Sequence, residues 1–320
     1  MKFHMRIFYS FLFSPVLLLL MASCKNESGK ITTPTLKNSI RYATGLSIYK
    51  QPGYSIVKVK NPWPKATKDY TYILREANAV IPDSLKSFTT INVPIKTIIV
   101  TSTTHIPSLT MLSVEKSLVG FPKLDYISST KVRKRIDAGE IKELGSNQSL
   151  NTEAVIDLSP SVIIGYGIDN NNQALDNLTK SGLKVLLNGD WNEQSSLGKA
   201  EWIKLFGALY GLEYMADAIF TAIETDYKNT LNLAKNVKSR PVVIAGAIFE
   251  NTWYLPDGNS WGAQLITQAG GTYVFAESKG TGSLSLPFEK VLAEGSDATF
   301  WIGPGQFTSL SEMLSANPHY

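Results

Sequence analysis

Two stretches of this chain carry the same short theme and decide its fold: Asn151–Gly165 reads NTEAVIDLSPSVIIG, and Pro287–Gly303 reads PFEKVLAEGSDATFWIG. In each, a glutamate stands two residues before a Val and a second aliphatic residue, and a Ser, an apolar run and a Gly follow. The two acids, Glu153 and Glu289, lie far apart in the chain, which excludes a short-period solenoid. We therefore expect two related lobes, each showing one acid on the first turn of a short helix. Such a pair is more typical of docking than of catalysis.

Length and composition limit the class of protein. With 320 residues, of which 43% are apolar and 18% charged, the chain can build one large or two medium globular domains. This balance is not typical of a disordered chain. The formal charge is +4, and no Lys/Arg stripe with interleaved aromatic residues is found, so nothing indicates binding to nucleic acid.

The N-terminus is typical of an exported lipoprotein. A basic start precedes an apolar run, which ends in small residues directly before Cys24, the single cysteine. We expect a lipoprotein signal peptide at 1–23, lipidation of Cys24, and a polar tether at 24–38. The protein would then lie in the periplasm or cell envelope, anchored to a membrane. The alternative is a leader followed by a free cysteine, and Met21 stands where such lipoprotein boxes usually have Leu.

From residue 39 the chain first predicts a β meander and then an α/β pattern. The meander strands are Leu46–Tyr49, Tyr54–Val59 and Tyr70–Leu74, with a turn at Gln51-Pro52-Gly53. The later strand candidates are Ile95–Val100, Val162–Ile164, Lys184–Leu187, Val242–Ala245 and Ala298–Ile302. The helical windows are Ile106–Leu118, Asn172–Ser181, Trp261–Ala269 and Phe288–Glu294. This alternation predicts mostly parallel sheets in an N-terminal lobe at 39–195 and a C-terminal lobe at 239–320.

A long apolar stripe separates the two lobes. Apolar residues recur at steps of three and four from Trp202 to Ala234, which is the pattern of one helix face. We expect a single spine helix at 196–238, in which Gly198–Asn236 would span about 55–60 Å at 1.5 Å per residue. The alternative is two helices broken near Gly207 or Gly211.

Leader, tether, lobe, spine helix, lobe and paired glutamates together resemble the substrate-binding lipoproteins of ABC importers. The resemblance is to the helical-backbone class (class III periplasmic binding proteins), which carries iron–siderophore, haem and vitamin B12. It covers about residues 90–320. Its motifs are Lys96–Val100 running into Ser102–His105, Asn151–Gly165, Trp253–Pro256 followed by Gly262–Leu265, and Phe288–Leu292.

The resemblance implies a partner and a docking role for the paired acids. In that family one glutamate per lobe meets arginines of the permease, and Glu153 and Glu289 stand at the matching places. Charge-assisted bonds to Arg would orient the two proteins. The alternative is that each is a first-turn glutamate favoured by the helix dipole.

The chain departs from the family at its C-terminal end. Members usually continue for some tens of residues beyond a segment like 307–320, adding a strand and terminal helices. We therefore expect the second lobe, 239–320, to be incomplete, with exposed apolar edges.

The resemblance also implies that a ligand lies between the lobes, at the C-terminal ends of the strands. The candidate ligand-binding residues, all on loops that follow strands, are Thr103, Thr104, His105, Tyr166, Trp191, Phe249, Trp253 and Tyr254. The alternative for the two threonines is helix capping. For the aromatic residues it is packing in a core.

The ligand is expected to be a chelate rather than a bare ion. The chain has three histidines, and His105 alone lies outside the leader and the tail, whereas zinc or manganese carriers need several converging ligands. We expect no metal site and no resident cofactor. The vitamin B12 carrier has an aromatic residue a few positions before its first-lobe glutamate, and 145–148 here has none. This favours a siderophore-type iron chelate, with haem and cobalamin as alternatives.

An enzyme is not expected. The chain has no Gly-x-Ser-x-Gly elbow, no phosphate loop and no His-Glu-x-x-His motif. An exported lipid-anchored enzyme is the disfavoured alternative, and a surface lipoprotein that holds a nutrient without an importer is a third. The expected partners are an ABC permease–ATPase complex, a small-molecule chelate and the membrane, and the protein is expected to be a monomer.

Overall fold

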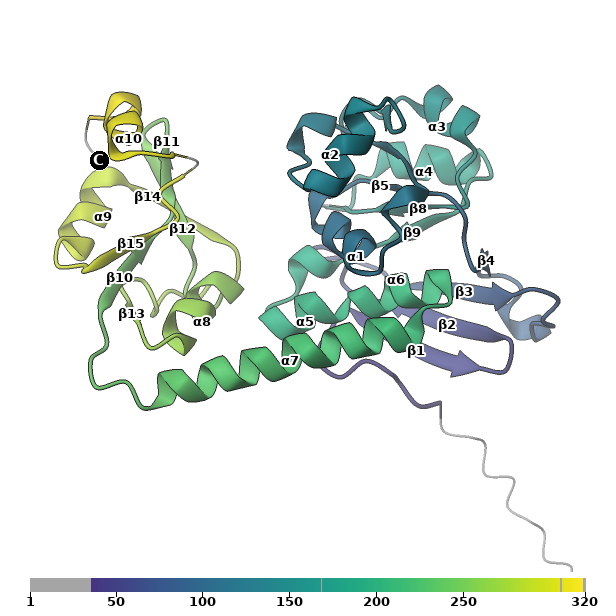
Figure 1. The fold of residues 1–320 in the computed structure, drawn as a ribbon, viewed down its shortest axis with the longest axis horizontal. Helices are drawn as coiled ribbons and strands as arrows, with labels where there is room; N and C mark the ends of the chain where they lie inside the picture. The colour runs from purple at the N-terminus through teal and green to yellow at the C-terminus, as the bar shows by residue number, and fades with distance from the viewer. Residues whose placement is uncertain (1–35, 168, 306, 319–320) are drawn as a thin grey trace, which may run out of the picture. The chain divides into compact units, whose positions relative to one another are not determined.

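The computed structural model describes residues 36–167, 169–305 and 307–318, and the chain divides into two units, 1–36 and 37–320. The expected signal peptide, Cys24 and nearly all of the tether lie outside the described residues. Within the described part, no helix has the length and apolarity needed to cross a membrane. The unit 37–320 contains an N-terminal four-stranded sheet and two α/β lobes (Figure 1).

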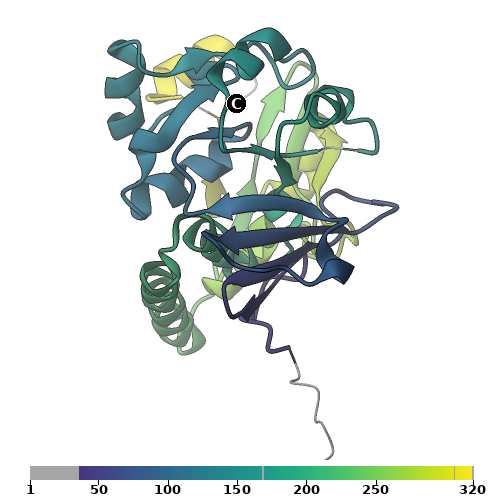
Figure 2. The same cartoon turned by 90° about the vertical axis from the view of Figure 1, so that its right-hand side faces the viewer.

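The N-terminal sheet confirms the predicted meander. Its strands, in the order β1-β2-β3-β4 (Figure 2), are β1 (Leu46–Gln51), β2 (Tyr54–Val59), β3 (Tyr70–Glu76) and β4 (Thr89–Val93). The first three are antiparallel, and β4 adds parallel to β3. Gly53 has a φ of 79°, which a tight turn between β1 and β2 requires. One face of the sheet, with Leu46 and Val57, joins the main core, while Ile56 and Ile73 form a small cluster on the other face.

The first lobe is built on a parallel sheet in the order β7-β6-β5-β8-β9. Its strands are β5 (Ile98–Val100), β6 (Leu118–Phe121), β7 (Lys142–Glu143), β8 (Val162–Gly165) and β9 (Val185–Leu187). Its helices are α1 (Ile106–Met111), α2 (Thr130–Asp137), α3 (Thr152–Leu158), α4 (Gln173–Lys180) and the 3₁₀ turns η2 (Thr103–His105) and η5 (Asp190–Asn192). Because strand side chains alternate between faces, Ile98 and Ile164 enter one core and Ile99 and Ile163 enter another.

Two details of the first lobe differ from the sequence prediction. The helix expected over 106–118 ends at Met111, and the chain then forms β6, which was not predicted. In a fully buried strand the apolar residues do not alternate with polar ones. Such a short apolar run therefore cannot be told from a segment of buried helix by its sequence pattern.

The helix predicted over 196–238 is broken, and the structure supports the alternative of a break near Gly211. The segment forms three helices, α5 (Ser196–Glu201), α6 (Ile203–Tyr210) and α7 (Glu213–Lys235). Gly211, with a φ of 67°, ends α6, and α6 packs against α7 (Figure 1). A Cβ built on Gly207 would lie 2.5 Å from the Cβ of Ala216, so this crossing needs a glycine. The connection to the second lobe is therefore α7 alone, of 23 residues and about 35 Å.

The second lobe combines two three-stranded sheets. The parallel one, in the order β13-β10-β15, contains β10 (Val242–Ala245), β13 (Thr272–Tyr273) and β15 (Phe300–Ile302). The antiparallel one, in the order β11-β12-β14, contains β11 (Ala247–Phe249), β12 (Thr252–Pro256) and β14 (Ser283–Pro287). Its helices are α8 (Trp261–Gln268), α9 (Phe288–Gly295) and α10 (Leu310–Ala316). The lobe has its own core, which includes Trp253, Tyr273 and Val291.

The two repeated stretches occupy equivalent places, which confirms the prediction of two related α/β lobes. In the first lobe α3 leads into β8, which pairs in parallel with β5. In the second lobe α9 leads into β15, which pairs in parallel with β10. Glu153 therefore lies on the first turn of α3, directly before β8, and Glu289 lies on the first turn of α9, directly before β15.

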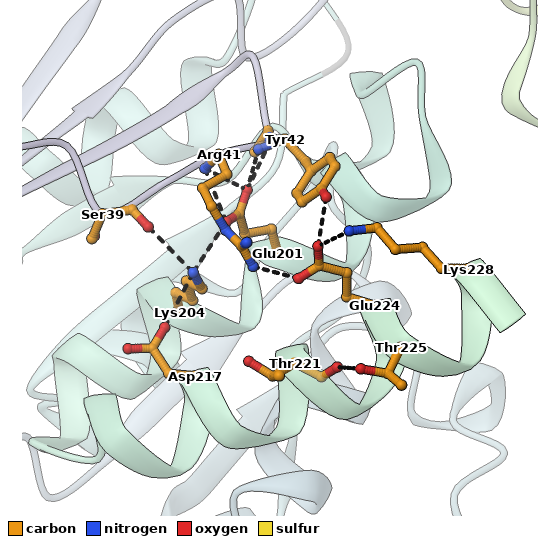
Figure 3. A network of polar contacts seen from close by, with 11 residues as sticks. Ser39, Arg41, Tyr42, Glu201, Lys204, Asp217, Thr221, Glu224, Thr225 and Lys228 are labelled. Carbon is orange, nitrogen blue, oxygen red and sulfur yellow. Dashed lines mark hydrogen bonds and ion pairs between the residues drawn. The ribbon is translucent and has the colours of Figure 1, made fainter.

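Buried charges fix the chain before β1 to the helices (Figure 3). The fully buried carboxylate of Glu201 accepts the backbone N–H groups of Arg41, Tyr42 and Ala43 at 2.6–3.0 Å and pairs with Lys204 at 3.1 Å. On α7, Glu224 accepts the Tyr42 hydroxyl at 2.6 Å and pairs with Arg41 and with Lys228. Charge-assisted hydrogen bonds of this kind are stronger than neutral ones. The N-terminal sheet is thus tied to the helices that carry the second lobe.

Candidate functional site

A cavity of about 440 Å³ receives side chains from both lobes. The first lobe contributes Trp191 and Asn192 of η5, which follows β9. The second lobe contributes the end of β12, the start of α8 and the loop before β14. The lining residues are Pro64, Trp191, Asn192, Glu193, Tyr254, Leu255, Pro256, Ser260, Trp261, Gly262, Thr281, Gly282 and Ser283. Its volume lies in the range of small-molecule sites, and aromatic and proline faces are prominent in its walls.

Direct contacts join the two lobes beside this cavity. The Lys199 ammonium, on α5, lies 5.4 Å from the centre of the Trp261 ring on α8. It also donates to the carbonyls of Asp190 and Trp191 at 3.0 and 2.9 Å. Burial lowers the pKa of Lys199, while Asp190 and Glu193 act in the opposite direction. The cation–π contact and the two carbonyls hold η5 and α8 in place as opposite walls.

The carboxylate in the cavity wall is already fully engaged. Glu193 accepts hydrogen bonds from the N–H and hydroxyl of Thr44, from the Gly45 N–H and from the Trp202 indole, at 2.8–3.0 Å. It is 4% exposed. Four donors leave little capacity for a metal ion, so this acid positions the chain before β1 rather than offering a ligand.

The predicted loop after β5 lies close to the turn after β9. The Thr104 hydroxyl donates to the Asp190 carboxylate at 3.2 Å and interacts with the Ser102 hydroxyl at 2.9 Å. The His105 side chain is fully buried, and neither of its ring nitrogens has a hydrogen-bond partner among the described residues. Burial lowers its pKa. This imidazole is therefore inside the lobe, 6.0 Å from the centre of the Phe206 ring, and His105 is not among the residues that line the cavity between the lobes.

Two of the eight predicted ligand-binding residues come together at the cavity between the lobes, Trp191 and Tyr254. The Trp191 indole donates to the Gly167 carbonyl at 3.2 Å, and Tyr254 is 44% exposed. Two others line separate cavities. Thr103 belongs to one of about 240 Å³ beside α1, and Tyr166 belongs to one of about 300 Å³ beside α4.

The remaining predictions fall elsewhere. Trp253 is 5% exposed, donates its indole N–H to the Ala245 carbonyl at 3.1 Å, and packs in the core of the second lobe. Phe249 is 67% exposed on β11 and is not in the cavity wall. For Trp253 the core alternative is the one the structure supports, because on β12 its neighbour Tyr254 points to the opposite face.

Three prominent wall residues are not among the eight predicted ligand-binding residues: Pro64, Pro256 and Trp261. Trp261 is the first residue of α8, after the Ser260 cap, and is 43% exposed. A large aromatic side chain directly after a capping serine was a usable signal, because the first turn of a helix borders the preceding loop. Pro64 lies on the loop between β2 and β3, in a region that the resemblance over residues 90–320 does not cover.

The expected docking acids are both at the surface. Glu153 and Glu289 are exposed, and each stands on the first turn of its helix, α3 and α9. Among the described residues neither forms a hydrogen bond or an ion pair. Asn151 caps α3 through the Ala154 N–H at 3.0 Å, so Glu153 is not needed as a cap. Both carboxylates are free to meet a partner.

A family model described as periplasmic binding protein matches residues 98–318. An uncharacterized lipoprotein of Methanocaldococcus jannaschii is 28% identical over 322 residues, covering 92% of this chain and 77% of that protein. A second uncharacterized lipoprotein of the same organism is 27% identical over 272 residues, covering 80% of this chain and 66% of its own length.

Solved structures show the same fold. A possible iron-binding (periplasmic solute-binding) protein from Staphylococcus epidermidis superposes with a TM-score of 0.53 at 16% identity, over 71% of this chain and 84% of that one. A periplasmic heme binding protein from Pseudomonas aeruginosa gives a TM-score of 0.53 at 18% identity, over 70% of this chain and 78% of that one. At this identity the likeness concerns the fold.

Proposed function

Because the chain belongs to the periplasmic binding protein family, we propose that it is the substrate-binding lipoprotein of an ABC importer and captures a siderophore-type ferric chelate. The observation that carries this proposal is the cavity lined from both lobes, with Trp191 on one side and Tyr254 and Trp261 on the other. A ligand held there would contact both lobes at once. The lipoprotein relatives support an envelope location, with Cys24 as the proposed anchor.

The chemistry of the walls favours a ligand that brings its own metal coordination. The Glu193 carboxylate is occupied by four donors, and aromatic and proline residues line the same cavity. Such faces suit the organic shell of a chelate, because they contribute apolar area and stacking without competing for the iron.

Docking through Glu153 and Glu289 is the second part of the proposal. Both acids are exposed, have equivalent places in the two lobes, and have no partner among the described residues. Two fixed carboxylates can orient the protein on a permease through charge-assisted bonds to arginine.

Haem is a second candidate ligand, because a specific residue favours it. The Tyr254 side chain is part of the cavity wall and is 44% exposed, and a tyrosine phenolate can serve as an axial ligand of haem iron. Haemin titration followed by its Soret band separates the two ligands. A band that shifts in the native chain and not in Tyr254→Phe would favour haem over a siderophore.

Uptake measurements test the proposal as a whole. In cells that lack the native chain, Glu153→Ala/Glu289→Ala should reduce uptake of the bound ferric chelate at least about ten-fold, with an unchanged Kd for that chelate. The matched control is Asp157→Ala/Glu294→Ala, which removes exposed acids from later turns of the same helices and should transport normally. Normal uptake by the Glu153/Glu289 variant would refute docking. Failure of the native chain to bind any ferric chelate would refute the carrier function.

A further inference from the structure

Part of the ligand cavity comes from a region that the family match does not include. The match begins at residue 98, yet Pro64, on the loop between β2 and β3, lines the cavity together with Trp191 and Trp261. A second cavity of about 350 Å³ adjoins the first and shares Pro64 and Thr281 with it. The N-terminal sheet therefore supplies a wall of the site as well as covering the core.

This loop, residues 61–65, is held in place by contacts with the first lobe. The Trp63 side chain is 2% exposed, and its indole donates to the Asn170 side chain at 3.0 Å. The Asn192 side chain donates to the Asn61 carbonyl at 2.9 Å. Such contacts keep the loop ordered before any ligand arrives, and this preorganisation lowers the entropic cost of binding.

The backbone of the loop adopts conformations that non-glycine residues rarely take. Asn61 has a φ of 43° and Lys65 a φ of 61°. Asparagine tolerates this region, whereas for lysine it costs free energy and persists where neighbouring structure enforces it. Lys65 lines the second cavity, and so does Thr281 of the second lobe.

The charge of this second cavity is distinctive. The Lys65 side chain is exposed, and among the described residues its ammonium has no ion-pair partner. The nearby Glu193 carboxylate already has four donors. Thr281 belongs to the same wall. An ammonium without an ion-pair partner favours an anionic group of a ligand.

We infer that the loop 61–65 is a specificity element of the ligand site: the cavity with Trp191 and Trp261 takes the iron-bearing core of a chelate, and Lys65 takes a peripheral carboxylate on the same molecule. This inference rests on the proposed function, because it assigns a class of ligand to that site. It predicts a preference for carboxylate-bearing ferric chelates over neutral ones with the same core.

Two chelates that share one core test the inference by isothermal titration calorimetry. N-succinyl ferrioxamine B carries a free carboxylate, and N-acetyl ferrioxamine B is neutral at the same position. The native chain should bind the succinyl form about five- to ten-fold more tightly, as expected for one charge-assisted contact. Lys65→Gln should abolish the preference without weakening the acetyl form, while Trp261→Ala should weaken both forms.

A control just beyond the loop, before β3, and the remaining outcomes separate the inference from the proposed function. Lys68→Gln removes an ammonium that lies 5.1 Å from the Tyr70 ring centre, outside both cavity walls, and should keep the preference. If the native chain binds both forms equally, or if Lys65→Gln keeps the preference, the inference is wrong and the carrier function stands. If neither form binds, the proposal of a siderophore ligand is refuted, and the inference about Lys65 is refuted with it.

Discussion

The two lobes use the same helix–strand repeat but bury it to different degrees. In the first lobe β8 lies between β5 and β9, and Ile163 and Ile164 are fully buried. In the second lobe β15 pairs with β10 on one side, and among the described residues no strand covers its other edge. Phe300 and Ile302 are accordingly 56% and 51% exposed. The repeat determines where the helix, the strand and the acid lie, whereas the neighbouring strands determine how much apolar surface is buried.

The lobes also differ in their charges. The first lobe and the helices α5 to α7 carry buried carboxylates, such as that of Glu201 on α5, which accept hydrogen bonds from the chain before β1. The ion pair Lys290–Glu294 of the second lobe is about half exposed. Buried pairs are costly to break, whereas exposed pairs contribute little. We therefore expect the first lobe, together with helices α5 to α7, to be more sensitive to substitution than the second lobe.

Removal of the Glu201 carboxylate gives the largest expected effect. Glu201→Ala leaves three backbone N–H groups unpaired and the Lys204 ammonium, 9% exposed, without this partner. The free energy of unfolding from urea denaturation should fall by about 3–5 kcal/mol. Glu294→Ala, its counterpart in the second lobe, should cost about 1 kcal/mol or less. A similar loss of unfolding free energy in the two variants would contradict the difference in charge burial between the two regions.

The repeated strands provide the next test. Ile164 and Ile302 precede the glycine of each repeat, and each pairs with the last residue of the lobe's first strand, Val100 or Ala245. Ile164→Ala should reduce the free energy of unfolding by about 2–5 kcal/mol because it leaves a cavity in a closed core. Ile302→Ala should cost about 1 kcal/mol or less, because half of that side chain is already in water. Equal costs would mean that the edge of β15 is covered in solution.

Acid should weaken the network around α7. Hydrogen bonds from Lys228, then from the Tyr42 hydroxyl, hold the pKa of Glu224 at about 2, below its usual value of 4.5. A carboxylate with a depressed pKa in the folded state stabilises the fold above the unfolded pKa, and this stability is lost as the pH falls from about 4.5 to about 2. Urea denaturation across this range should show a smaller loss of stability in Glu224→Gln than in the native chain. If the free energy of unfolding depends on pH in the same way in Glu224→Gln and in the native chain, Glu224 does not have this stabilising role.

A second, milder acid effect is expected at higher pH. Burial lowers the pKa of His105 below its usual 6.5, so the folded state keeps the imidazole neutral. The unfolded chain then binds a proton more readily, and stability should decline as the pH falls below about 6.5. His105→Gln should remove this slope between about pH 6.5 and 5 while leaving the lower-pH loss at Glu224. Identical slopes in the native chain and the variant would show that His105 is solvated.

The sequence predicted the repeated units well, because each unit is local. The theme around Glu153 and Glu289 contains its own helix start, apolar run and final glycine, and both copies form the predicted helix and strand. The spine was predicted wrongly for a physical reason. Residues of α6 and of α7 face one continuous core, so their apolar spacing passes unbroken through the turn at Gly211.

The site was predicted in part. Trp191, predicted because it follows a parallel strand, does line the cavity between the lobes. Trp253 was misplaced because it and Tyr254 are adjacent on β12, and the sequence alone does not tell which of two neighbours faces the core. Pro64 lines this cavity and Lys65 lines the adjoining one, both from the loop between β2 and β3. Proximity between segments so far apart in the chain leaves no local pattern in the sequence.

The most direct measurement is calorimetric titration of the native chain with ferric siderophores, haemin and cyanocobalamin, repeated with Trp261→Ala and with the exposed control Phe249→Ala. The account predicts one ferric siderophore bound per chain, a Kd at least about ten-fold weaker in Trp261→Ala, and no change in Phe249→Ala. Absence of binding to any chelate, or equal binding by the native chain and Trp261→Ala, would contradict the claim that the two lobes enclose a chelate.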